Sequence, residues 1–207
     1  MSRAVVCIHG ALRSRAGMVP TAAYLRRLGF DARTFGYPTR RGSLEDHGRR
    51  LDAFLTAWLP DPRPPLGFLT HSMGGLVVRA WLAQRPDAVD VRVAMLSPPN
   101  QGSALARANA RNPLFHVLYG QAAKTLQTPG VPSLPPVPDN AQVLVLAGGR
   151  GTAAGYNPLL PGDDDGVVAV EEMGLPDAPP EFVGGMHGML QWTPAILRRA
   201  ADFLGAA

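Results

Sequence analysis

The stretch FLTHSMGGLVVRAWL, residues 68–82, joins an apolar run to a segment with helical spacing through one polar corner. Residues 66–70 are short and apolar, as in a buried strand, and residues 74–84 carry apolar side chains at helical intervals until Pro86. Ser72 occupies the corner, with Gly74 and Gly75 behind it. A sharp strand-to-helix turn strains the backbone at the serine and demands small neighbours. The pattern predicts that the Ser72 side chain projects away from the backbone at this turn. The alternative is an ordinary Ser-Gly turn that joins a strand to a helix.

The sequence around this corner alternates short apolar runs with longer amphipathic segments. Strand–helix alternation of this kind predicts a mostly parallel sheet of about six strands with helices on both faces. We expect one domain over residues 1–207, in which 99–141 is a long lid-like connection that holds a helix and the proline-rich stretch 129–138. The predicted strands are 4–8, 31–37, 66–70, 91–96, 142–148 and 181–185, and the main predicted helices are 18–30, 43–59, 74–84 and 193–206.

The composition is that of an ordinary globular protein, with 207 residues, 46% apolar and a formal net charge of +4. The basic residues are scattered, so we expect no nucleic-acid partner. No apolar run approaches the roughly 18 residues of a membrane span, so we expect no stable membrane insertion. The single cysteine, Cys7, lies in an apolar run and is expected in the core. The same run is too short for a signal peptide, which predicts a cytoplasmic protein unless a leader was removed. The oligomeric state is left open.

A serine hydroxyl becomes a nucleophile only with a base within reach and donors for the oxyanion that forms. A serine at a strand-to-helix turn has the backbone N–H of the next residue, Met73, at the positive end of a helix. The motif for such a nucleophile elbow is G-x-S-x-G. Here it stands as Thr70-His71-Ser72-Met73-Gly74, so Thr70 replaces the first glycine.

With this elbow in place, the chain resembles small bacterial lipases and esterases of the α/β-hydrolase superfamily from about residue 4 to 192. HSMGGLVVR is similar to their elbow, CIHGALRS to their oxyanion loop, LSPPNQGS to a segment after a strand, GDDDGVVAVEEM to the acid loop and GGMHGML to the histidine loop. The resemblance implies the α/β-hydrolase fold in a minimal form without a separate cap domain. It also implies that the oxyanion hole uses the backbone N–H of Met73 and of Ala11, with Leu12 as the alternative to Ala11.

Along the chain of members of this superfamily, the nucleophilic serine comes first, the acid second and the histidine third. This order favours one of the five histidines as the base. His187 alone follows a late predicted strand and precedes the final helix, so we expect it at the sheet edge that holds Ser72. His116, in the long connection, is the alternative base. His47 is expected to be exposed on a helix.

The acid is expected between the strand 142–148 and His187, in GDDDGVV. Asp165 matches the Asp-Gly-x-Val pattern of the resembled family, and its carboxylate would accept the Nδ1–H of His187. Asp163 and Asp164 are expected to be solvated. An acidic turn or a calcium site is the alternative, but the sequence lacks a spaced ligand set, so we expect no metal and no cofactor.

The predicted reaction is acyl transfer from a small hydrophobic ester to water, with Ser72 as nucleophile, His187 as base and Asp165 as the orienting acid. Three alternatives stay open: a thioester substrate, an amide substrate, and a relative that binds an acyl ligand or a partner without catalysis. The segment around residues 114–119 either lines an acyl pocket or packs on the core. The predicted substrate-binding residues are Leu12, Leu114, Phe115 and Leu118.

Overall fold

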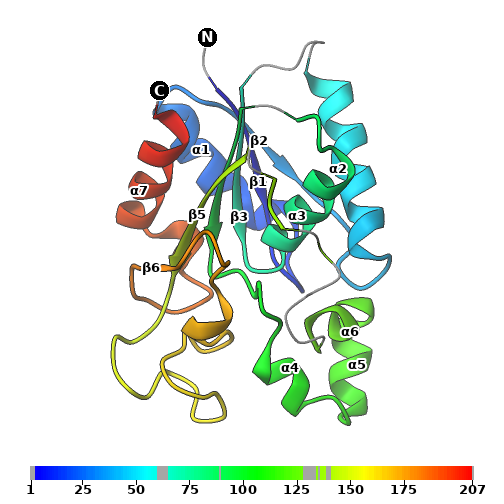
Figure 1. Ribbon diagram of the computed structural model, residues 1–207, viewed down its shortest axis with the longest axis vertical. Helices are drawn as coiled ribbons and strands as arrows, with labels where there is room; N and C mark the ends of the chain where they lie inside the picture. The colour runs from blue at the N-terminus through cyan, green and yellow to red at the C-terminus, as the bar shows by residue number, and fades with distance from the viewer. Residues whose placement is uncertain are drawn as a thin grey trace.

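The computed structural model describes residues 3–59, 65–88, 90–127, 134, 136–138 and 141–206. Its centre is a six-stranded sheet in the order β2-β1-β3-β4-β5-β6, in which every neighbouring pair is parallel (Figure 1). This confirms the predicted fold class. The strands are β1 Ala4–Ile8, β2 Asp31–Phe35, β3 Leu66–His71, β4 Val91–Leu96, β5 Ala141–Ala147 and β6 Glu181–Phe182.

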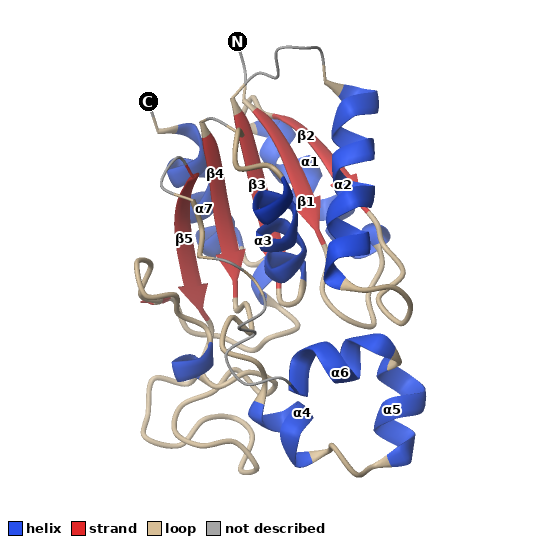
Figure 2. Cartoon of the chain, turned by 45° about the vertical axis from the view of Figure 1, so that its right-hand side comes forward, coloured by secondary structure: helices blue, strands red, loops and turns tan. Residues whose placement is uncertain are grey.

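Helices cover both faces of the sheet (Figure 1). On one face α2 and α3 pack against each other and on the central strands, and on the other face α1 and α7 do the same. Three short helices, α4, α5 and α6, lie beyond the carboxyl ends of the strands (Figure 2). The helices are α1 Val19–Arg27, α2 Leu44–Trp58, α3 Gly74–Gln84, α4 Ala104–Ala108, α5 Pro113–Tyr119, α6 Gln121–Gln127 and α7 Pro194–Gly205.

The central strands are apolar on both sides because both sides are buried. In β1, Val6 and Ile8 belong to the core cluster under α2 and α3, whereas Val5 and Cys7 belong to the cluster under α1 and α7. Successive side chains of a strand point to opposite faces, so a strand covered twice needs a continuous apolar run. Cys7 is buried as expected.

The structure differs from the sequence expectations in three places. The strand predicted over 181–185 is only two residues long, and the long connection contains three short helices in its described part. His47 on α2 was expected to be exposed but is buried, because its ring packs on Tyr37 with centroids 4.7 Å apart. The proline-rich stretch 129–138 lies largely outside the described residues. Among the described helices, none has the length and apolar character needed to cross a membrane.

Candidate active site

Ser72 lies at the predicted corner, between the last residue of β3 and the first residue of α3. Its φ of 54° is in the left-handed region, which a non-glycine residue adopts only under strain. The Ser72 backbone N–H donates to the carbonyl of Leu96 at 2.8 Å, which anchors the turn to β4. A Cβ on Gly74 would lie 2.8 Å from the Ile8 carbonyl oxygen, so the helix can begin here only with a glycine. This is a nucleophile-elbow geometry.

The threonine that replaces the first motif glycine is tolerated because it lies within the sheet. Thr70 is fully buried in β3, where it pairs with Met95 of β4. Its hydroxyl oxygen has no hydrogen-bond partner among the described residues, so the buried hydroxyl lowers the stability of the fold.

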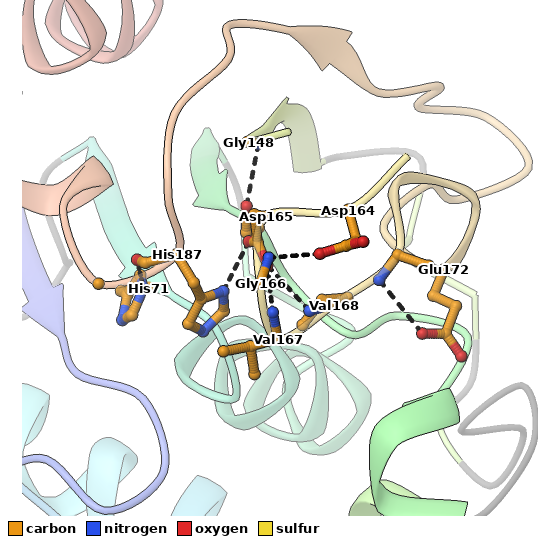
Figure 3. A network of polar contacts seen from close by, with 12 residues as sticks. His71, Gly148, Asp164, Asp165, Gly166, Val167, Val168, Glu172 and His187 are labelled. Carbon is orange, nitrogen blue, oxygen red and sulfur yellow. Dashed lines mark hydrogen bonds and ion pairs between the residues drawn. The ribbon is translucent and has the colours of Figure 1, made fainter. Parts of the chain in front are cut away.

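His187 and Asp165 meet at the carboxyl edge of the sheet (Figure 3). The His187 Nδ1 lies 2.6 Å from Asp165 Oδ2, and the His187 backbone N–H donates to the Asp165 carbonyl at 2.8 Å. The two loops are thus joined through both side chain and backbone. Because Asp165 accepts at Nδ1, the proton of a neutral imidazole is held there and Nε2 is left as the basic nitrogen.

Both oxygens of the Asp165 carboxylate accept hydrogen bonds. Its side chain is 0% exposed, and its other oxygen, Oδ1, accepts from the N–H groups of Val167 and Val168 at 3.0 and 2.8 Å. Burial acts to raise the pKa of Asp165. The hydrogen bond and charge of His187, the Val168 N–H and the Ser97 hydroxyl outweigh it, so the pKa of Asp165 is lowered overall. The carboxylate therefore stays charged beside the imidazole.

The expectation that both neighbouring aspartates are solvated is wrong for Asp164. Asp164 is fully buried, and its carboxylate accepts from the backbone N–H groups of Asn157 and Gly166. Asp163 is half-buried and accepts from the N–H groups of residues 150 and 151. Both carboxylates shape the acid loop, because a loop without regular structure must satisfy its backbone N–H groups in other ways.

His71 connects the histidine loop to the elbow. Its Nε2 lies 2.8 Å from the carbonyl oxygen of His187, and the centroids of the two rings are 4.6 Å apart. Figure 3 shows the His187 ring between His71 and Asp165. Since His71 directly precedes Ser72 in the chain, this contact places His187 beside the elbow.

His71 is neutral in this position. Burial lowers its pKa, and the nearby His187 lowers it further, to about 3. A neutral His71 can donate its Nε2–H to the His187 carbonyl, which fixes its tautomer. It therefore adds no positive charge that would compete with a protonated His187.

The predicted oxyanion donors are Met73, which follows Ser72 in the chain, and Ala11, which follows Gly10 in the loop after β1. Gly10 approaches so closely that an added Cβ would be 2.7 Å from the Cβ of Ser72, which brings the loop after β1 against the elbow. The backbone N–H groups of Ala11 and Met73 donate to no other residue within the described chain. The backbone N–H of Leu12, the alternative donor, donates a hydrogen bond to the Thr39 hydroxyl oxygen at 3.3 Å.

The predicted substrate-binding residues are mostly on the surface. Leu114 on α5 is 71% exposed, Leu118 and Leu12 are also exposed, and Phe115 is half-buried with its ring stacked on Tyr119 at 4.3 Å. Their role in binding stays a prediction. His116, the alternative base, contacts the Ala110 carbonyl at 2.7 Å on the lid-like segment, whereas His187 is the histidine that contacts Asp165.

Sequence reasoning missed two residues that support the site. One is His71, which lies beside Ser72 in the elbow motif and to which the sequence assigns no role. The other is Ser97, which is fully buried with a φ of 44°. Its hydroxyl oxygen accepts from the Gly148 N–H at 3.0 Å, and the hydroxyl helps to lower the pKa of Asp165. The signal for Ser97 was its place directly after β4, at the edge where the carboxyl ends of parallel strands gather.

Comparison with known proteins supports the fold. No protein-family model and no curated protein sequence matches the chain. Among solved structures, the mature form of Bacillus licheniformis lipase BlEst2 has a TM-score of 0.75 at 22% identity over 98% of this chain and 89% of that one. The metagenomic carboxyl esterase MGS0156 has a TM-score of 0.74 at 16% identity over 98% and 74%. YbtT, a type II thioesterase of the yersiniabactin pathway, has a TM-score of 0.61 at 13% identity over 98% and 93%.

The chain therefore has the α/β-hydrolase fold, with its parallel sheet, flanking helices and strained serine corner after β3. At these identities the likeness establishes the fold alone, and what the chain does has to be argued from the site.

Proposed function

We propose that the protein is a serine hydrolase of hydrophobic carboxylic esters, with a triad of Ser72, His187 and Asp165. The observation that carries this proposal is the 2.6 Å contact between His187 Nδ1 and Asp165 Oδ2 at the edge where the strained Ser72 lies. A buried carboxylate that holds an imidazole by Nδ1 has the geometry of a catalytic base and its orienting acid.

The proposed mechanism uses Nε2 of His187, the ring nitrogen that does not contact Asp165. His187 Nε2 takes the proton of the Ser72 hydroxyl as the oxygen attacks the ester carbonyl, and the Ala11 and Met73 N–H groups donate to the oxyanion. The protonated imidazole, stabilised by Asp165, then gives its proton to the leaving alcohol. Water, activated by the same base, releases the acid from the acyl-enzyme.

Two features favour a hydrophobic ester. The apolar side chains of Leu114, Val117 and Leu118 are exposed on α5, beyond the carboxyl edge of the sheet (Figure 2). The compared structures also include a lipase and a carboxyl esterase. The thioesterase among them keeps a thioester substrate as the second candidate for the same triad.

The test combines labelling with turnover. A fluorophosphonate probe should label the wild type but not Ser72→Ala, and p-nitrophenyl esters of increasing chain length should be hydrolysed by the wild type only. The matched control is Ser14→Ala, because Ser14 is exposed and makes no side-chain cap bond. Turnover of matched ester, thioester and amide substrates separates the alternatives. If Ser72→Ala keeps full esterase activity, the proposal is wrong.

A further inference from the structure

A cavity lies on the face of the sheet that α2 and α3 cover. Its volume is about 470 Å³, within the range of sites that hold small organic ligands. Its floor includes Val143 of β5, and its walls include residues 136–138 and the turn Leu175–Ala178. The described lining contains none of Ser72, Asp165 or His187. The cavity is therefore separate from the proposed catalytic site.

The cavity contains a buried arginine that has no acidic partner in the described part of the chain. Arg79 of α3 is 6% exposed, and its guanidinium makes only hydrogen bonds of 3.4 Å, all to neutral oxygens of Asn100 and Leu134. Its Nε has no hydrogen-bond partner in the described chain. Arg79 forms no ion pair with any described residue. Burying a cation in this way is costly unless an anion compensates it.

Among the described residues, the carboxylates near the cavity do not supply that anion. Glu172 is buried, but its carboxylate is bound to Arg107 at 2.7 Å and to the Ala104 N–H at 2.6 Å. Asp177 lines the cavity but is exposed to solvent at the turn. The remaining polar side chains of the lining, Asn100 and Gln101, donate to backbone carbonyls of the 173–174 segment.

We propose that this cavity binds a monocarboxylate with an aliphatic tail. The carboxylate would pair with the Arg79 guanidinium, whose planar fork matches its two oxygens. The tail would lie along the apolar part of the lining, which includes Val137 and Val143. One buried cation with an exposed aspartate at the edge favours a single negative charge over a dianion. This inference is independent of the proposed function, because it involves no reaction at Ser72.

The test is calorimetric titration of the full chain with sodium octanoate, alongside octan-1-ol and octyltrimethylammonium. Arg79→Gln should weaken octanoate binding by about tenfold or more, the loss of a charge-assisted contact. Val143→Trp fills the floor of the cavity while Arg79 is kept, and it should weaken binding to a similar extent. If Arg79→Gln fails to fold, the Val143→Trp variant still tests whether octanoate binds in this cavity. The matched control, Arg111→Gln, removes an exposed arginine on the lid-like segment and should bind as the wild type does.

Several outcomes would overturn the proposal. They are no octanoate binding in the millimolar range, octan-1-ol binding as tightly as octanoate, and undiminished binding by Val143→Trp. Loss of binding in Ser72→Ala but not in Val143→Trp would place octanoate at the proposed catalytic serine. Because Ser72→Ala is expected to bind octanoate normally, failure of the proposed esterase activity leaves this test intact.

Discussion

Replacement of Asp165 by asparagine tests whether the buried carboxylate orients the imidazole. Its Oδ2 accepts from His187 Nδ1, and its Oδ1 accepts from the N–H groups of Val167 and Val168. An asparagine has one oxygen and one NH₂ group, so one of these two positions must face a donor. If the NH₂ faces His187, it forces the tautomer with the proton on Nε2, which cannot act as base. If it faces the two N–H groups, they lose their acceptor.

The expected effect on catalysis is large. Loss of the correct tautomer lowers kcat/KM by about 10³- to 10⁴-fold, which corresponds to roughly 4–5.5 kcal/mol of transition-state stabilisation. The unfolding free energy should also fall by about 1–3 kcal/mol, because a buried hydrogen bond is lost. Hydrolysis of p-nitrophenyl butyrate measures the first effect, and urea denaturation followed by circular dichroism measures the second.

Asp164→Asn is the matched control for burial. Asp164 is as deeply buried and also accepts from backbone N–H groups, but its donors are Asn157 and Gly166 of the acid loop rather than His187. It should lose a similar amount of stability while kcat/KM falls less than about tenfold. Asp163→Asn should reduce activity still less. If either of these variants loses more activity than Asp165→Asn, the acid has been assigned to the wrong residue.

Three further predictions concern the surroundings of the site. Gly10→Ala places a Cβ 2.7 Å from the Ser72 Cβ, so its kcat/KM should drop by about 10- to 100-fold. Gly17→Ala is the control, because its added Cβ has no atom within 4 Å, and its kcat/KM should equal that of the wild type. Equal activity of the two variants would refute the close approach of Gly10 to Ser72. Thr70→Val removes a buried hydroxyl that has no partner and should raise the unfolding free energy by about 1 kcal/mol in urea titrations, and a loss of that size would contradict it. Buried histidines with lowered pKa values take up a proton only when the chain unfolds, so the unfolding free energy should decline as the pH falls below about 6.5, by up to about 1.4 kcal/mol per pH unit for each. The histidines concerned are His9, His47 and His71. For His71 the loss of unfolding free energy continues to about pH 3. An unfolding free energy that stays constant between pH 6.5 and 5 would show that these side chains titrate normally.

The architecture of this chain could be predicted from its sequence. Five of the six strands lie within two residues of their predicted ends, because the period of apolar residues records which faces of an element are buried. The corner at Ser72 was also readable, since a strained turn into a helix requires glycine at particular positions and Gly74 has no space for a Cβ. Such features depend on a few consecutive residues, so a local pattern is enough to reveal them.

Which polar side chains are buried, and which groups they contact, could not be predicted from the sequence and depends on how the chain folds. Asp164 and Asp165 are neighbours of the same type, yet one binds its own loop and the other reaches His187, 22 residues away. His71 contacts the His187 carbonyl across 116 residues, and Arg79 on the nucleophile helix lies in a cavity whose walls come from distant loops. These contacts form between segments that the sequence separates, and their energies depend on distance and burial that no local pattern of residues contains.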